Sequence, residues 1–235
     1  MFEEVIKLSG KRPGPISIIL AGVHGNEKCG VEALANILPS LSIEAGELFI
    51  AYGNPLALKN DQRFMEANLN RMFKSDEELS DSDRASYEYG RAQFLKQYLD
   101  QAGASLDLHA SLNPNSRPFI ICEPDAKEIV SYLPIDLVVS GFDKIEPGGT
   151  DYYLNRLGKI GICVECGYAN DPNSVKIAEA SILTFLSARG LLSNNFILQK
   201  HSQLNVSSLH LTKTYSFKLT KPFAVSPSTI VDTET

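Results

Sequence analysis

The sequence predicts an α/β fold in which helices flank a mostly parallel or mixed central sheet. Short apolar runs recur along the chain and alternate with segments of helical periodicity. Most of these runs are continuously apolar, which is typical of strands that are buried on both faces. A length of 235 residues with 43% hydrophobic residues suits one such domain with a small appendage.

The expected strands are the apolar runs at 16–22, 47–54, 104–110, 118–123, 135–141 and 159–168. The expected helices lie between them, at 28–38, 81–103, 125–133 and 174–190. For the helix at 81–103 we expect Asp81 or Ser82 as the cap and Gly103 as the end.

Residues 1–200 are predicted to form the main α/β domain, and 201–235 a short β segment. The segment shows β-like alternation without helical pattern, and it is too short to close a barrel or a sandwich. The main domain should therefore hold any site.

Composition excludes several classes of function. A net charge of −6 argues against a general nucleic-acid surface, which needs a basic patch. The N-terminus lacks the apolar core of a secretory signal, and no apolar run approaches the ~18 residues of a membrane span. We therefore predict a soluble, cytoplasmic protein with no nucleic-acid or membrane partner.

The four cysteines are expected to be free thiols in that compartment. Cys163 and Cys166 have CxxC spacing, but they lie on one expected strand, where these positions point to opposite faces. This placement argues against a shared metal or a redox pair.

Two segments place metal-binding side chains at expected strand ends. His24 and Glu27 follow the strand at 16–22, and His109 ends the strand at 104–110. In open α/β sheets ligands bind beyond the carboxyl ends of strands, and two His with one Glu is a common set for catalytic zinc. The alternative is that each histidine merely packs or caps, but the second strand-end histidine favours a metal.

Glu165 lies at the end of an apolar strand, where a carboxylate is costly unless it faces a cleft or a partner. Burial would raise its pKa toward the range that suits a general base. The alternative is a structural pair with an Arg or Lys.

The segment 60–73 concentrates polar side chains suited to an anion: Arg63, Asn68, Asn70 and Arg71. Arginine binds carboxylates through two parallel hydrogen bonds and is always charged. The segment is a candidate anion pocket, unless its arginines are only solvated surface residues.

Together, the motifs GVHGNE, GNP, QRF with NLNRMF, DLH and VECG, in this order, resemble the succinylglutamate desuccinylase/aspartoacylase family. The resemblance spans roughly residues 16–190. It implies a zinc-dependent deacylase with a zinc carboxypeptidase-like α/β fold.

The resemblance also implies roles for matching residues. His24, Glu27 and His109 match the ligands of one zinc ion per chain. Glu165 matches the base that activates water and then protonates the leaving amine. Arg63 matches the arginine that polarises the scissile carbonyl and stabilises the oxyanion.

Asn70 and Arg71 match residues that hold a substrate carboxylate, and Arg156 lies near the place of another carboxylate-binding arginine. Asp107 is expected to orient His109 from the same strand face. The family continues into a larger C-terminal β domain that contributes a tyrosine. Here that region is short, apparently truncated relative to the family, and Tyr215 is not assigned to that role.

The leading hypothesis is a zinc hydrolase that cleaves the amide bond of an N-acyl amino acid or a similar small anionic substrate. The alternative within enzymes is a metallocarboxypeptidase acting on peptide C-termini. The alternative from another class is a non-catalytic ligand-binding or regulatory protein that keeps the fold. A homo-oligomer is compatible with each hypothesis.

Overall fold

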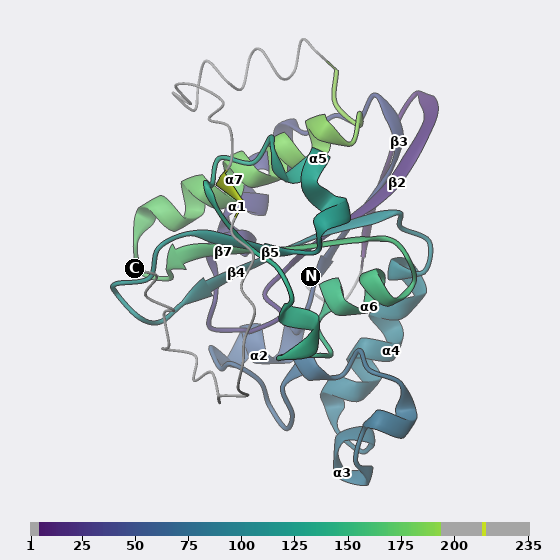
Figure 1. Ribbon diagram of the computed structural model, residues 1–235, viewed down its shortest axis with the longest axis vertical. Coiled ribbons are helices and arrows are strands. Elements are labelled where there is room, and N and C mark those ends of the chain that lie inside the picture. The colour runs from purple at the N-terminus through teal and green to yellow at the C-terminus, as the bar shows by residue number, and fades with distance from the viewer. Residues whose placement is uncertain (1–4, 194–212, 215–235) are drawn as a thin grey trace.

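The computed structural model describes residues 5–193 and 213–214 (Figure 1). Within these residues the strands form one sheet in the order β1-β3-β2-β4-β7-β5-β6-β8. The strands are β1 (Ile6–Ser9), β2 (Arg12–Ala21), β3 (Ala45–Tyr52), β4 (Ala104–Ser111), β5 (Phe119–Cys122), β6 (Leu137–Val139), β7 (Ile160–Tyr168) and β8 (Lys213–Thr214).

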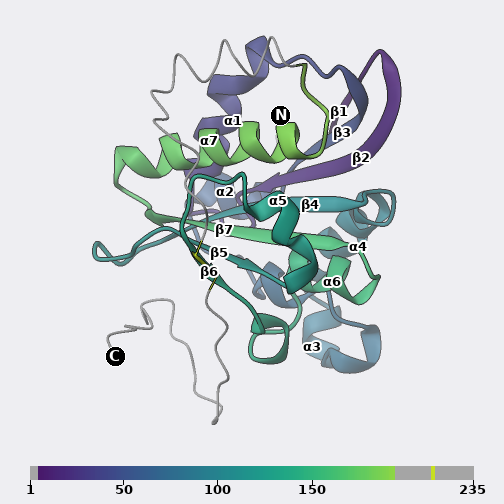
Figure 2. The same cartoon turned by 45° about the horizontal axis from the view of Figure 1, so that its top comes forward.

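Helices cover both faces of the sheet, so the structure has three layers. Figure 2 shows α1 and α7 on one face and α4 and α6 on the other. The α-helices are α1 (Cys29–Ile37), α2 (Pro55–Asn60), α3 (Asp81–Arg84), α4 (Tyr87–Leu99), α5 (Lys127–Val130), α6 (Thr150–Arg156) and α7 (Pro172–Ala188). The predicted α/β class is confirmed.

The sheet is mixed, with a parallel centre. β2 pairs in parallel with β3 and β4, and β4 pairs in parallel with β7. β1 on β3 and β5 on β7 are antiparallel. In the β4–β7 register His109 is the partner of Glu165, and Asp107 is the partner of Cys163, so all four side chains point to the same face.

Alternate residues of each central strand enter different halves of the core. In β2, Ile19 and Ala21 pack in the cluster beneath α1 and α7, and Ile18 and Leu20 pack in the cluster beneath α4. Both faces of the strand are thus buried, which explains its continuous apolar sequence.

The expected single helix at 81–103 is wrong: the segment forms α3 and α4, and α4 ends at Leu99. Ser80 caps α3 by accepting the amide of Asp83, and Ser86 caps α4 by accepting the amide of Tyr89. A serine hydroxyl satisfies an amide that would otherwise lack a partner at the start of a helix, so two serines define two helices. Neither expected cap, Asp81 or Ser82, is used.

Other elements differ from expectation in extent. The helix expected at 125–133 is reduced to a 3-10 turn at Pro124–Ala126 followed by α5. β1, α2 and α6 have no counterpart among the expected elements. The four cysteines are buried free thiols, as expected.

The predicted boundary at residue 200 and most of the β segment at 201–235 lie outside the described residues, as does Tyr215. The two-residue strand β8 pairs in parallel with β6 at the sheet edge. Among the described residues, no helix is long and apolar enough to cross a membrane.

Candidate metal centre and active site

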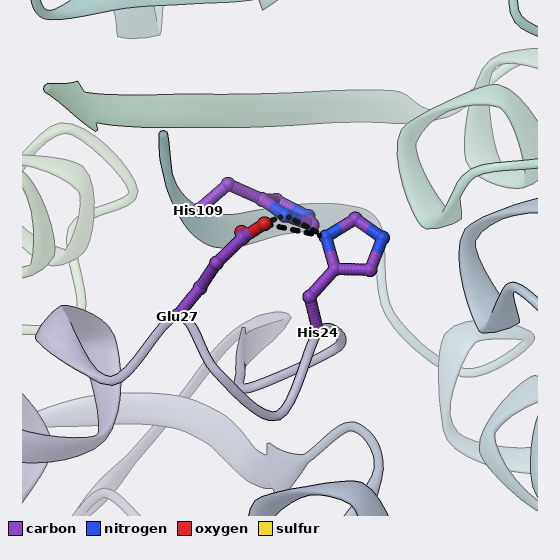
Figure 3. Close-up of side chains that lie close together, drawn as sticks. All are labelled: His24, Glu27 and His109. Carbon is purple, nitrogen blue, oxygen red and sulfur yellow. Dashed lines mark hydrogen bonds and ion pairs between the residues drawn. The ribbon is translucent and has the colours of Figure 1, made fainter. Parts of the chain in front are cut away.

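Three predicted side chains converge at the carboxyl edge of the sheet (Figure 3). His24 Nδ1 lies 2.9 Å from Glu27 Oε1, and His109 Nδ1 lies 2.9 Å from Glu27 Oε2. The two Nδ1 atoms are 3.2 Å apart. Each residue is at most 3% exposed. The loop after β2 supplies the first two, and β4 supplies the third.

Close packing against α2 fixes the loop that carries His24 and Glu27. A Cβ at Gly25 would stand 2.1 Å from the backbone carbon of Ala57, so only glycine can occupy this position. The Gly25 amide also donates to the carbonyl of Arg63 at 3.2 Å. The glycine is therefore required by a close approach of two backbones.

The donor set suits zinc. Zinc–ligand bonds of about 2.0–2.1 Å in a tetrahedral site put neighbouring donors about 3.3 Å apart. The two Nδ1 atoms are 3.2 Å apart, and each lies 2.9 Å from its nearer Glu27 oxygen, Oε1 for His24 and Oε2 for His109. These separations are close to that value. Two imidazole nitrogens and a carboxylate leave one tetrahedral position for water or substrate, as in catalytic sites.

Asn68 sets the proton position on His24. Its Oδ1 accepts the amide of Asn70 at 3.0 Å and lies 3.0 Å from His24 Nε2. An amide oxygen can only accept, so Nε2 carries the proton and Nδ1 presents its lone pair to the centre. Burial lowers the pKa of His24, which favours this neutral form.

Asp107 lies against the Nε2 atom of His109 and orients its ring. Its Oδ2 lies 3.2 Å from His109 Nε2 and accepts the hydroxyl of Thr150 at 2.6 Å. Burial opposes a charge on His109, but Asp107 and Glu27 outweigh it and hold the pKa well above its usual range. His109 therefore carries a proton on each ring nitrogen, with Nε2 facing Asp107 and Nδ1 donating to Glu27, and a metal would displace the proton on Nδ1.

Glu27 is buried yet ionised. Burial alone would raise its pKa, but His24 and His109 outweigh that effect and hold the pKa well below its usual range. Oε2 also accepts the amide of Ala110 at 3.1 Å, and Oε1 accepts Arg63 Nη1 at 2.7 Å. A carboxylate in this state is ready to bind a cation.

Glu165 lies beside His109 in the sheet register, on the face of the candidate centre. Its side chain keeps partial solvent exposure, but protein groups surround its carboxyl, and burial raises the pKa to about 7. The charge of Glu27 contributes to this rise, and His109 opposes it. Among the described residues Glu165 forms no ion pair with Arg or Lys, in contrast to the structural alternative.

The predicted anion segment lies against the centre. Its arginines are partly exposed, with side chains 30% exposed for Arg63 and 31% for Arg71. Arg63 contacts Glu27, as described above. Arg71 pairs with Glu146 and donates to the carbonyl of Asn70 at 2.6 Å. The segment is therefore packed against other protein groups and is not a loop of purely solvated arginines.

Glu88, which sequence reasoning missed, holds this segment in place. The residue is fully buried in α4, and its carboxylate accepts the amides of Met65, Glu66 and Ala67 at 2.7–3.2 Å. It also accepts the side-chain amide of Asn54 at 3.0 Å. A signal was present in the sequence, because Glu88 continues the buried stripe of α4 at helical spacing.

Arg156 is not brought to the centre. It ends α6, whereas Thr150, which contacts Asp107, begins that helix. The Arg156 side chain is 54% exposed and pairs with Glu78 at 2.8 Å. The geometry does not support the substrate-binding role that was predicted for it.

Comparison with known proteins agrees with this geometry. The family model of the succinylglutamate desuccinylase/aspartoacylase catalytic domain matches residues 13–189. A succinylglutamate desuccinylase from Pseudoalteromonas atlantica is 26% identical over 223 residues, covering 82% of this chain and 63% of that protein. An N-acyl-aromatic-L-amino acid amidohydrolase (carboxylate-forming) from Xenopus tropicalis is 28% identical over 195 residues, covering 77% and 62%.

Among solved structures, the product-bound ectoine utilization protein EutE (DoeB) from Ruegeria pomeroyi shares the fold, with a TM-score of 0.68 at 20% identity. The match covers 92% of this chain and 65% of that one. The chain thus spans less than two thirds of the length of these relatives. Because the family model covers most of the sequence, the chain belongs to the succinylglutamate desuccinylase/aspartoacylase family.

Proposed function

We propose that this chain is a zinc-dependent deacylase that cleaves the amide bond of an N-acyl amino acid or a similar small anionic substrate. The observation that carries the proposal is the convergence of His24, Glu27 and His109, whose ligand atoms all lie within 4.8 Å of one another. The two Nδ1 atoms and the ionised carboxylate face the same point, and a bound cation would displace the Nδ1 proton of His109.

His24, Glu27 and His109 would hold one zinc ion per chain. Zinc in such a site supplies a Lewis acid that acidifies water and polarises a carbonyl. Glu165, with a pKa near 7, takes a proton from the attacking water and delivers it to the leaving amine. Arg63 donates to the developing oxyanion, and Asn70 and Arg71 orient the anionic group of the substrate.

The names of two relatives support the chemistry. The Pseudoalteromonas protein is a desuccinylase of succinylglutamate, and the Xenopus protein is an amidohydrolase of N-acyl aromatic amino acids. Both names describe the removal of an acyl group from an amino acid. The two differ in acyl group and amino acid, so the substrate of this chain has to be identified by assay.

A zinc-loaded screen over N-acetyl and N-succinyl amino acids, run beside short peptides, tests the proposal. We expect release of a free amino acid from an N-acyl substrate, and Glu165→Ala should reduce kcat by at least about 100-fold. The variant should retain one zinc per chain by metal analysis, because Glu165 is not among the converging ligands.

Other outcomes of the screen decide between the alternatives. Cleavage of peptides alone would replace the deacylase with a metallocarboxypeptidase. Substantial activity in Glu165→Ala would contradict the role of that residue. A zinc-free protein without hydrolysis of any substrate would favour the non-catalytic alternative.

A further inference from the structure

The guanidinium of Arg71, which the proposed function assigns to substrate, already has a carboxylate partner. Arg71 Nη2 pairs with Glu146 Oε2, and Nη1 donates to the carbonyl of Asn70. The side chains of Arg71 and Glu146 are 31% and 25% exposed. Solvent therefore reaches the pair.

Backbone contacts hold the segment 146–149 against the arginine. Gly148, at φ +106, would place a Cβ 2.7 Å from the carbonyl oxygen of Arg71, and its own carbonyl accepts the amide of Phe73 at 3.2 Å. The amide of Glu146 donates to the carbonyl of Phe142 at 2.8 Å. These contacts fix the backbone on both sides of the pair, so the fold holds Glu146 near Arg71.

The next glycine brings the segment onto Asn70 as well. A Cβ at Gly149 would lie 3.0 Å from Asn70 Oδ1 and 2.4 Å from Asp151 Oδ1. Asn70 Oδ1 is buried and has no hydrogen-bond partner within the part of the chain that the structure describes. The segment 146–149 therefore packs along both residues that were assigned to the substrate's anionic group.

We infer that Glu146 is a specificity-determining residue that competes with the anionic group of the substrate for Arg71. The inference rests on the proposed function, in which Arg71 receives that group. A carboxylate is recognised best when it accepts two parallel hydrogen bonds from one guanidinium. With Glu146 in place, an incoming carboxylate has two options. It has to displace Glu146 from the Arg71 guanidinium, or it has to bind beside Glu146 and bear the repulsion between two negative charges.

The consequence is selectivity against a simple anion at this subsite. Glu146 weakens the binding of a free carboxylate, and it penalises a neutral group such as a carboxamide much less. Replacing it with glutamine keeps the size of the side chain and removes the charge, so affinity for carboxylates should rise.

The kinetic test compares Glu146→Gln with the parent, both zinc-loaded, on the best N-acyl amino acid from the screen and on its carboxamide. We expect KM for the carboxylate to fall about tenfold, with kcat changed less than about twofold. KM for the carboxamide should stay within about twofold. Glu47→Gln is the matched control, since Glu47 is also partly exposed and paired with a base, Lys7, in the edge pairing of β3 with β1.

A binding test decides the inference without turnover. Succinate titrated by calorimetry should bind Glu146→Gln about tenfold more tightly than the parent, and Glu146→Ala should shift in the same direction. In an Arg71→Ala background the Glu146→Gln gain should disappear, because the contested guanidinium is gone.

The outcomes separate the inference from the proposed function. Equal or weaker binding of succinate to Glu146→Gln, or a gain that persists without Arg71, would overturn the inference. So would the absence of succinate binding to every variant. If the parent hydrolyses no N-acyl substrate, the proposed function fails, and the succinate titration still tests the competition for Arg71.

Discussion

At the scale of single residues, the partners of the two histidine Nε2 atoms decide how the candidate centre is arranged. Asn68 and Asp107 each lie against the Nε2 atom of one histidine, so both rings turn Nδ1 toward Glu27. The two histidines therefore present the same atom through different partners, an amide in one case and a carboxylate in the other. Because a carboxylate is the stronger acceptor, His109 should be the more basic ligand of the two.

Asp151 gives a residue-scale prediction on stability. Burial raises the pKa of this carboxyl, in the first turn of α6, from 3.8 to about 6. The folded chain therefore binds a proton more tightly than the unfolded chain. Stability from this group is fully present below about pH 4 and is lost as the pH rises through about 6.

Asp151→Asn removes the charge that is costly to bury. We expect the free energy of unfolding to rise by about 1–3 kcal/mol at pH 8, and this gain to exceed the gain at pH 5 by about 1 kcal/mol. Urea unfolding at both pH values measures the difference. The exposed Asp136→Asn serves as a control and should change little. A destabilised Asp151→Asn at pH 8 would contradict this account of Asp151.

At the scale of elements, α4 acts as the support for the anion segment. Each oxygen of Glu88 accepts two hydrogen bonds: Oε1 from the amide of Met65 and from Asn54, and Oε2 from the amides of Glu66 and Ala67. Since these amides lie between Arg63 and Asn68, a fixed backbone here fixes the spacing of the side chains that reach the centre.

Glu88→Gln should disturb that support while keeping the size of the side chain at position 88. Whichever end of glutamine carries the NH₂ group, two donors lose their acceptor in a fully buried place. We expect a loss of about 2–4 kcal/mol in the free energy of unfolding, measured by urea denaturation. Glu66→Gln is the neighbouring control. Within the described residues this exposed carboxylate accepts only the amide of Tyr87, so the loss should stay below about 1 kcal/mol. Equal losses in the two variants would rule out the support role of Glu88.

Sequence periodicity predicted strands β2 to β7 and the main helices, but it missed β1 and merged α3 with α4. Ser80 caps the start of α3 and Ser86 caps the start of α4, and a search for a period of 3.6 residues does not detect such a second start. α2 and α6 were missed because each is a short helix, and packing decides their existence more than pattern does.

At the scale of the whole molecule, the sequence predicted the site residues at strand ends. It did not predict pairs of residues that are distant in the sequence. His24 and His109 directly follow or end apolar runs, so the carboxyl edge of a parallel sheet brings them together. Glu146 reaches Arg71 across 75 residues, which no local pattern encodes. The predicted role of Arg156 finds no support in the contacts that the structure describes, in which Arg156 pairs with Glu78. Oligomeric state and cellular compartment remain predictions.

The candidate metal centre joins parts of the chain that are distant in sequence, so zinc bound there should stabilise the whole fold. The ligands come from the loop after β2 and from β4, and the unfolded chain has no preformed site. With free zinc at 100 times its Kd, the folded state gains about 2.7 kcal/mol. For a domain of this size, that gain corresponds to a rise of about 5–10 °C in Tm.

Thermal unfolding of the chain in zinc and in a chelator measures this gain. The parent should melt about 5–10 °C higher with zinc, magnesium should have little effect, and His109→Ala should melt at the same temperature in zinc and in chelator. The variant also loses zinc by metal analysis, because only two of the three ligands remain. If the Tm of the parent does not respond to zinc or chelator, then the convergence of His24, Glu27 and His109 is a buried hydrogen-bonded cluster and not a metal site.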